Sequence, residues 1–386
     1  MMLSTFIRAE LSLLSALGYF GVLSMGRIVT IIGTRPEIIK MAPVVKALDA
    51  LDHDHVLVHS GQHYDLMMDR IFFRDMELRE PNYRFELKEQ PPHLQVATTM
   101  RQVATVAKSA DLVIIHGDTN TTVAGALLAS KLDRPLAHVE AGIRSFDKSM
   151  PEEVNRIIAD QLSNLLFAPT PVSRENLQRE NVTEGVHVVG NSVIDALLQN
   201  LPIAEKRSDV LSRLGLTPGG YMILTFHRSE NVDSKERMSR ALVAFERAAD
   251  EAEMPILFPI HPRTAKRLQE FGLEKRADEQ ASLRRIEPTG YLDMLILEKN
   301  AALVMTDSGG LQEESCFFRV PCVTLRENTE RPETLEIGSN VLAGTDPERV
   351  RDAVRRQLDA ERNWLNPYGD GTTGERIAQL VAASLG

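Results

Sequence analysis

The sequence has few cysteines, no excess of basic residues and no apolar run long enough to cross a membrane. Two Cys among 386 residues cannot form a disulfide framework, and no C-x-x-C pair occurs, so nothing requires an oxidising compartment or structural zinc. Acidic residues outnumber basic ones by 54 to 44, and the net charge of −10 argues against a nucleic-acid-binding protein. A locally basic pocket for an anion is still compatible with this charge.

The first 24 residues differ from the rest of the chain. Their apolar run, residues 11–23, is shorter than the ~20 residues that a membrane span needs. Glu10 follows Arg8 in the flank, which is not typical of a secretory signal. We therefore expect residues 1–24 to be an extension outside the fold, with an N-terminal anchor as the alternative. We expect a cytoplasmic protein that does not bind membranes.

Short β-branched runs alternate with helical patterns along the remaining chain. The apolar runs at residues 27–33 and 111–116 are each followed by an amphipathic segment, at 36–51 and 121–132. This alternation predicts parallel sheets covered by helices on both faces. After a largely polar stretch at 200–220 the pattern restarts. Strands of a second set are predicted at residues 221–226, 255–260, 302–306 and 320–325.

The repeated pattern predicts an α/β protein of two doubly wound, Rossmann-like domains that face each other across a cleft. Such sheets bind ligands beyond the carboxyl ends of their strands. Residues that carry the chemistry are therefore expected directly after the strands.

Basic residues follow the first strand. Thr34 and Glu37 form a capping-box pattern, and the N-terminus of a helix at a sheet edge favours anions. Arg35 could bind a phosphate bidentately, and Lys40 adds a point charge. The alternative is a well-capped helix with a solvated Arg35 and Lys40. A Walker motif is absent.

Carboxylates follow the next strands of the first half. Asp118 and Glu140 each come at a strand end, and Glu152 and Glu153 follow in a Pro-led turn. Carboxylates that converge from different loops can serve as acid and base when their surroundings separate their pKa values. The alternative is that Asp118 merely caps the helix that follows it.

The second half offers residues suited to phosphate and ribose. His227 and Arg228 follow its first strand, although a lone loop His is structural more often than not. The turn Ser308-Gly309-Gly310 opens a helix, so backbone N–H groups can approach a phosphate. Glu314, one turn further, could accept hydrogen bonds from a ribose, and Arg331 lies in a later turn. Histidines between residues 53 and 63 read as a solvated loop, so we expect no metal and no cofactor.

Ten motifs in order, from residue 27 to the C-terminus, together resemble the non-hydrolysing UDP-N-acetylglucosamine 2-epimerases. They are GTRPEIIKMAPVVKAL (33–48), GQHYD (61–65), HGDTNTT (116–122), HVEAGIRS (138–145), PEEVNR (151–156), VGNSVIDAL (189–197), HRSEN (227–231), TDSGGLQEE (306–314), TERPET (329–334) and NPYGDG (366–371).

The resemblance implies a glycosyltransferase-B type fold, whose last helix returns to the first domain. We accordingly expect residues 25–192 plus 366–386 to form one domain and 193–365 the UDP-binding domain. The implied reaction inverts C2 of UDP-N-acetylglucosamine, giving UDP-N-acetylmannosamine, by eliminating UDP to a 2-acetamidoglucal and adding it back. A homodimer is the family expectation, and the expected partner is a UDP-sugar substrate.

The resemblance also implies roles for individual residues. The catalytic positions are Asp118, Glu140, Glu152 and His227. The UDP-binding positions are Arg35, Lys40, Ser308, Gly309, Gly310, Glu314 and Arg331. Gln62, His63 and Arg228 match positions that bind a second, activating UDP-N-acetylglucosamine. The chain departs from the family pattern at Tyr64 and Ser229, so retention of this second site is a separate question from the reaction.

Four other functions are compatible with parts of this pattern. The same reaction could act on a UDP-2,3-diacetamido-hexose, and a hydrolysing 2-epimerase would release N-acetylmannosamine and UDP. The Arg35-Pro36-Glu37 sequence argues against the hydrolysing branch. A glycosyltransferase would leave the carboxylates of the first half unexplained. A non-catalytic sensor of nucleotide sugars would usually have lost them.

Overall fold

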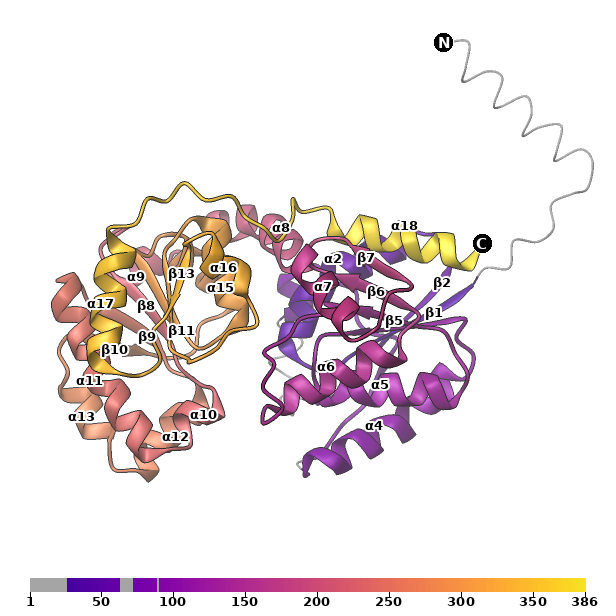
Figure 1. Cartoon of the computed structure of the whole chain (residues 1–386), viewed down its shortest axis with the longest axis horizontal. Coiled ribbons are helices and arrows are strands. Elements are labelled where there is room, and N and C mark those ends of the chain that lie inside the picture. The colour runs from indigo at the N-terminus through magenta and orange to yellow at the C-terminus, as the bar shows by residue number, and fades with distance from the viewer. Residues whose placement is uncertain (1–25, 63–71, 89) are drawn as a thin grey trace, which may run out of the picture.

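The computed structural model describes residues 26–62, 72–88 and 90–386, which form two α/β units (Figure 1). The first unit contains a seven-stranded sheet and the second a six-stranded sheet, and all strand pairings that the structure describes are parallel. The predicted α/β class with two doubly wound sheets is therefore confirmed.

The first sheet has the order β3-β2-β1-β4-β5-β6-β7. Its strands are β1 (Arg27–Ile32), β2 (Asp54–His59), β3 (Tyr83–Arg84), β4 (Leu112–His116), β5 (Leu136–Val139), β6 (Leu165–Ala168) and β7 (Val186–Val188). The helices of this half are α2 (Arg35–Asp49), α4 (Pro92–Ala107), α5 (Asn120–Lys131), α6 (Pro151–Leu162), α7 (Pro171–Arg179) and α8 (Ser192–Arg207).

The second sheet has the order β10-β9-β8-β11-β12-β13. Its strands are β8 (Met222–Thr225), β9 (Ile256–Pro259), β10 (Leu283–Ile286), β11 (Leu303–Thr306), β12 (Cys322–Thr324) and β13 (Asn340–Leu342). The helices are α9 (Val210–Leu214), α10 (Ser229–Val232), α11 (Lys235–Ala252), α12 (Pro262–Glu270), α13 (Glu274–Glu279), α14 (Tyr291–Lys299), α15 (Gly309–Phe318), α16 (Pro332–Glu336) and α17 (Pro347–Leu358), and α18 (Thr373–Leu385) ends the chain.

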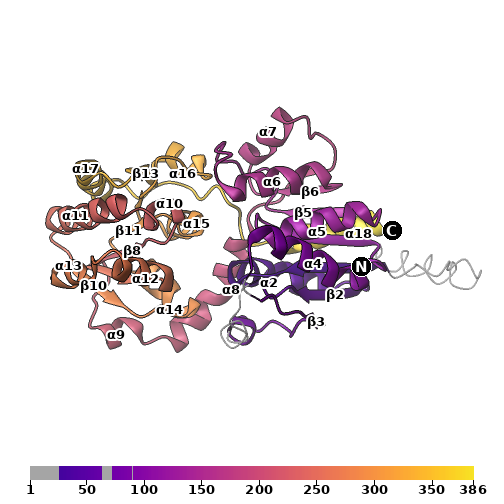
Figure 2. The ribbon, with the colours of Figure 1, turned by 90° about the horizontal axis from the view of Figure 1, so that it is seen from below.

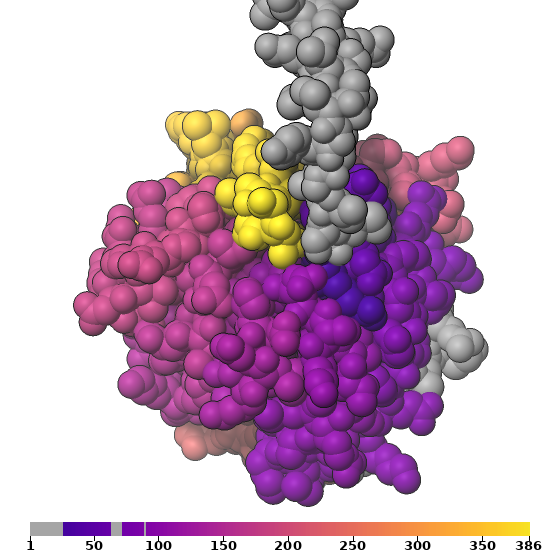
Figure 3. Space-filling model, turned by 90° about the vertical axis from the view of Figure 1, so that its right-hand side faces the viewer, coloured from indigo at the N-terminus to yellow at the C-terminus, as the bar shows by residue number. Residues whose placement is uncertain are grey.

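The chain passes between the units twice, near α8 and again before α18 (Figures 1 and 2). Helix α18 packs against α2, and its Ile377 and Val381 are buried in the core of the first unit. Gly374 permits this contact, because a Cβ there would lie only 2.8 Å from the carbonyl oxygen of Pro43. In the space-filling view the last residues (yellow) lie directly on the N-terminal half (Figure 3). The expected boundaries at residues 192 and 366 stay predictions.

Most predicted strands are present to within one or two residues at each end. The polar stretch at 200–220 holds the end of α8 and all of α9, rather than an open linker. Cys316 and Cys322 are buried and unpaired, as expected of small apolar residues. No helix in the described part of the chain is long and apolar enough to cross a membrane. The extension expected at residues 1–24 lies outside the described residues.

The strand orders determine where a ligand can bind. In each sheet the direction of strand addition reverses at one point, between β1 and β4 in the first sheet and between β8 and β11 in the second. A crevice opens beyond the strand ends at such a point, because the flanking helices lie on opposite faces. The motifs at residues 33–40, 116–122, 227–231 and 306–314 follow these four strands.

Candidate active site

A buried chain of charges crosses between the two units. Lys40, on α2, lies with its Nζ 2.5 Å from Oε1 of Glu140 and 3.4 Å from Oε2 of Glu313 on α15. Glu313 is also ion-paired with Arg331, and its Oε1 accepts a hydrogen bond from Asn191 at 2.9 Å. The two units are thus joined through one ammonium, one guanidinium and two carboxylates.

Glu140 is held as an anion. It follows β5 with a φ of 67°, in the left-handed region. Non-glycine residues rarely adopt this conformation, and those that do are often found at functional sites. Burial alone would raise the pKa of Glu140, but the charge of Lys40, with that of Arg331, holds it well below its usual range. Burial lowers the pKa of His116 to about 4, so the contact of 3.6 Å between His116 Nε2 and Glu140 Oε2 involves a neutral imidazole.

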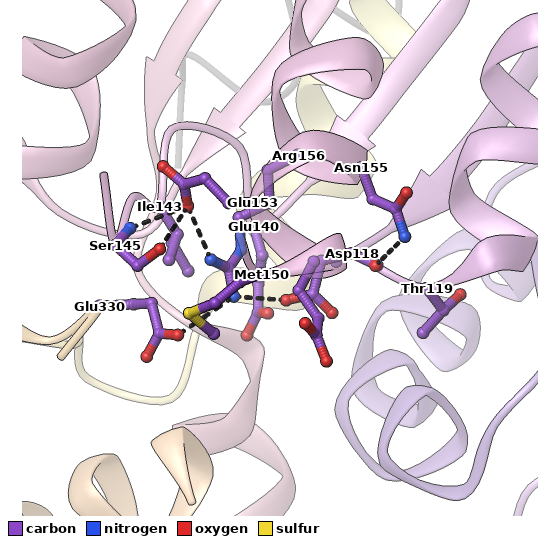
Figure 4. A network of polar contacts seen from close by, with 12 residues as sticks. Asp118, Thr119, Glu140, Ile143, Ser145, Met150, Glu153, Asn155, Arg156 and Glu330 are labelled. Atoms are coloured by element: carbon purple, nitrogen blue, oxygen red, sulfur yellow. Dashed lines mark hydrogen bonds and ion pairs between the residues drawn. The ribbon is translucent and has the colours of Figure 1, made fainter. Parts of the chain in front are cut away.

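Asp118 belongs to a second network, drawn in Figure 4. Its Oδ2 lies 2.5 Å from the guanidinium of Arg156, which is also 3.0 Å from Glu153. The same guanidinium lies 3.7 Å from Oε1 of Glu330 in the second unit. Thr119, not Asp118, caps α5: its hydroxyl accepts the hydrogen bond from the N–H of Thr122. Asp118 therefore does not cap α5, which was the alternative explanation for its position.

Glu152 is placed differently from its neighbour Glu153. Glu153 is buried and accepts hydrogen bonds from the backbone N–H groups of Ser145 and Phe146, so it holds the loop after β5. The Glu152 side chain is 39% exposed in the first turn of α6, and its Oε1 lies 3.6 Å from the guanidinium of Arg228. This contact joins a predicted catalytic carboxylate to a residue predicted for a second nucleotide site.

His227 is oriented by a buried aspartate that we did not predict. The carboxylate of Asp307 accepts hydrogen bonds from the backbone N–H groups of His227 and Arg228, and lies 3.3 Å from Nδ1 of the His227 ring. Burial lowers the pKa of His227, while the charge of Asp307 opposes that shift. The ring lies 5.5 Å from that of His261, whose pKa is lowered by burial and, to a smaller extent, by the charges of His227, Arg263 and Arg35. The charge of Arg35 therefore reaches the second unit.

The first turn of α15 has no side-chain cap. Ser308 is the N-cap residue, but its side chain makes no capping hydrogen bond, so it does not satisfy the N–H groups behind it. A Cβ at Gly309 would lie 3.6 Å from the Arg331 guanidinium, and one at Gly310 would lie 3.9 Å from the Ser308 hydroxyl. Backbone donors, Ser308 and Arg331 therefore meet at a helix N-terminus, an arrangement suited to phosphate.

Glu314, Gln62 and His63 complete the set of predicted residues. Burial raises the pKa of Glu314, on α15, to about 7. Gln62 lies in the first unit, and its Oε1 accepts hydrogen bonds from the backbone N–H and the hydroxyl of Thr121, at 2.9 and 2.8 Å. His63 lies outside the described residues.

Sequence reasoning missed the residues that link the predicted ones: Arg156, Asp307 and Glu313. Each stands inside a quoted motif, so its presence was visible but its partner was not. Glu313 is next to Glu314, and successive helix residues point about 100° apart, so the two could not share one role. That periodicity is the signal that could have separated them.

The arrangement can stabilise an anion and move protons. The α15 turn, Arg331 and His227 bring hydrogen-bond donors and positive charge to one side, while Asp118, Glu140 and Glu152 bring carboxylates from the other unit. These two sets supply the chemistry that a ligand carrying a phosphate group and a reacting carbon atom would need.

The family model described as UDP-N-acetylglucosamine 2-epimerase matches residues 46–382. The UDP-N-acetylglucosamine 2-epimerase of Methanocaldococcus jannaschii is 46% identical over 356 residues, which cover 91% of this chain and 97% of that protein. A crystal structure of the M. jannaschii protein, in complex with UDP-GlcNAc and UDP, has a TM-score of 0.88 and covers 92% of this chain and 99% of that one.

A relative with a different printed substrate is also similar. The UDP-2,3-diacetamido-2,3-dideoxy-D-glucuronate 2-epimerase of Pseudomonas aeruginosa is 36% identical over 361 residues, which cover 92% of this chain and 99% of that protein.

Proposed function

The chain belongs to the UDP-N-acetylglucosamine 2-epimerase family, and from this premise we propose that it interconverts UDP-N-acetylglucosamine and UDP-N-acetylmannosamine without net hydrolysis. It would do so by removing the C2 proton and UDP to give a 2-acetamidoglucal, then adding UDP back at C1 while a proton is delivered to the opposite face of C2. We also propose that it acts as a cytoplasmic homodimer, as the family resemblance implies.

One observation carries this proposal. Three carboxylates on separate loops of the first unit, those of Asp118, Glu140 and Glu152, each contact a cationic residue that faces or belongs to the second unit. A single carboxylate cannot easily reach both faces of C2, so inversion through a planar intermediate needs at least two proton-transfer groups. The carboxylates come from different elements, which allows them to approach a sugar from different sides.

The leaving group explains the cationic side of the site. The C2 proton is not α to a carbonyl, so direct removal is unfavourable. Departure of UDP gives C1 cationic character and makes the C2–H bond more acidic. The uncapped turn at Ser308, with Arg331 and His227, would stabilise the negative charge that develops on the pyrophosphate. Arg35 would add to it from the first unit.

The state of Glu140 suggests its part in the reaction. Its pKa is held well below the usual range, so it is a carboxylate at neutral pH and has no proton to donate, which leaves it the role of proton acceptor. The proton for the opposite face would then come from Asp118 or Glu152. Lys40, predicted as a phosphate contact, instead ion-pairs with Glu140 and Glu313, and we propose that it keeps Glu140 ionised.

The contacts between the units support the non-hydrolysing assignment. A 2-acetamidoglucal must be kept from water until UDP adds back, and closure of the two units around it would do this. Arg156 contacts Glu330, and the Thr170 hydroxyl donates to Glu333, both across the two units. A hydrolysing enzyme would instead admit water to the intermediate.

A second candidate substrate is favoured by the P. aeruginosa relative. A UDP-2,3-diacetamido-hexose differs only at the sugar, so the UDP-binding residues would be shared. Binding of a second, activating nucleotide at Gln62, His63 and Arg228 stays a prediction.

Product analysis tests the proposal. The protein is incubated with UDP-N-acetylglucosamine and followed by ³¹P and ¹H NMR, with Glu140→Gln as the inactive control. We expect UDP-N-acetylmannosamine with its pyrophosphate diester intact. Accumulation of free N-acetylmannosamine and UDP would contradict the non-hydrolysing assignment. Faster turnover of the 2,3-diacetamido glucuronate would select the second candidate.

A further inference from the structure

Two carboxyl side chains face each other behind the first turn of α15. Glu298 lies near the end of α14, which packs against α15, and Glu314 lies on α15 itself. Glu298 is 1% exposed and Glu314 is 8% exposed. Glu314 is the residue expected at the ribose of UDP, whereas Glu298 has no role in the proposed function.

The Glu298 carboxyl is buried without an N–H or hydroxyl donor among the described residues. The group that interacts with the Glu298 carboxyl is the carboxyl of Glu314. Two carboxylates have no donor between them, so this contact is a hydrogen bond only when one of them carries a proton. Burial and the charge of Glu314 raise the pKa of Glu298 well above its usual range, which makes Glu298 the acid of the pair.

We propose that Glu298 is a positioning residue: as a protonated acid it donates a hydrogen bond to Glu314 and orients that carboxylate toward a ribose diol. One acceptor position of Glu314 is then filled by Glu298, and the others are left for the 2′- and 3′-hydroxyls of a uridine nucleotide. Glu298 itself does not touch the ligand. This inference rests on the proposed function, because that function places Glu314 at the ribose.

The groups around Glu314 set its titration. Burial raises its pKa, the negative charge of Glu313 on the same helix adds to the rise, and Lys40 on α2 opposes it, which leaves the pKa at about 7. Tyr291, on α14, also faces the pair, and burial raises its pKa well above the usual value, so its hydroxyl stays neutral. A diol donates to the ionised form of Glu314. Nucleotide binding must therefore weaken as the pH falls below 7.

The wild-type protein tests this dependence directly. The Kd of UDP is measured by calorimetry at pH 6 and pH 8, beside that of 2′,3′-dideoxy-UDP, which carries the same phosphates but no diol. A site with a pKa of 7 predicts that UDP loses about tenfold more affinity than the dideoxy nucleotide between pH 8 and pH 6. Equal pH dependence for the two nucleotides would overturn the inference.

Two variants separate the hydrogen bond from simple packing. Glu298→Met has a similar length but no donor, so the pKa of Glu314 should rise by about one unit and UDP should bind about fivefold more weakly at pH 7 but equally well at pH 9. Glu298→Gln keeps an N–H donor and should restore the wild-type pH dependence. An equal loss at every pH in both variants would show a merely structural role and overturn the inference.

The outcomes also separate this inference from the proposed function. If the wild-type protein binds no UDP at either pH, the proposed function fails and the inference fails with it. If UDP binds but Glu298→Met keeps the wild-type pH dependence, the inference alone is wrong. If Glu298→Met does not fold, the inference is tested by the pH dependence of UDP binding to Glu298→Gln, together with the Kd values of UDP and 2′,3′-dideoxy-UDP for the wild-type protein.

Discussion

Replacing Lys40 with Met should destabilise the protein strongly, because it removes the cation shared by two buried carboxylates. The side chains of Lys40, Glu140 and Glu313 are 12%, 9% and 0% exposed. Glu313 would keep Arg331 as its partner, whereas the groups left near Glu140 are a neutral His116 and the more remote Arg331. One buried carboxylate is then left without its cation, which costs about 3–5 kcal/mol.

The loss should depend on pH. In the wild-type protein the pKa of Glu140 is lower folded than unfolded, so its stabilising contribution is complete above the unfolded value of ~4.5 and is lost only as the pH falls through the folded value. Without Lys40, burial raises the folded pKa above the unfolded value, so ionised Glu140 becomes destabilising at higher pH. The difference between wild type and Lys40→Met should therefore be larger at pH 8 than at pH 5.

Urea unfolding at both pH values, followed by fluorescence, measures this difference. The single tryptophan, Trp364, is buried where the chain crosses between the units, so it reports on that region. Lys46→Met is the matched control: Lys46 is a half-buried lysine of the same helix for which the described residues show no ion pair, and its loss should cost less than about 1 kcal/mol. If Lys40→Met were no less stable than Lys46→Met, or if its deficit did not change with pH, the reasoning would be wrong.

Three further predictions concern the site. Glu140→Gln and Asp118→Asn should each lower kcat at least ~10²-fold in a steady-state epimerisation assay, since each removes a proton-transfer group; near-normal turnover would refute that role. Asp307→Asn should lower the pKa of His227 further, because the charge that opposes the effect of burial is lost, and an NMR titration of the His227 ring would show a shift in the other direction if this is wrong. Gly309→Ala should leave the free energy of unfolding within about 0.5 kcal/mol of wild type, because its Cβ meets the nearest guanidinium only at 3.6 Å. It should still raise the Kd of UDP, since the methyl group occupies space beside the N–H groups of the turn, and unchanged binding would show that the phosphates lie elsewhere.

The fold was predictable where the local pattern was strong. The apolar run at residues 27–33 differs from β1 by one residue, and the run at 111–116 differs from β4 by one residue. We predicted no strand at β3, β7, β10 or β13, whose sequences YR, VHV, LRRI and NVL are short and largely half-buried or exposed. Short edge strands lack the apolar run that indicates a buried strand, so pairing with a neighbour decides their structure.

The candidate site was predictable as a set of residues but not as a set of contacts. The strand-end positions of Asp118, Glu140 and Ser308 follow from sheet topology alone. The partner of Lys40 does not, because Glu140 lies 100 residues away and Glu313 lies 273 residues away. Such pairs depend on how the two units meet, which no local pattern contains.

The most direct test of the central claim is the reaction of UDP-N-acetylglucosamine in D₂O, read at C2 by ¹H NMR and at the phosphates by ³¹P NMR. Our account predicts that deuterium enters C2 of both epimers while the nucleotide sugar stays intact, because each turnover breaks and remakes the C2–H bond. Epimerisation with the original C2 proton retained, or no reaction at all, would contradict it.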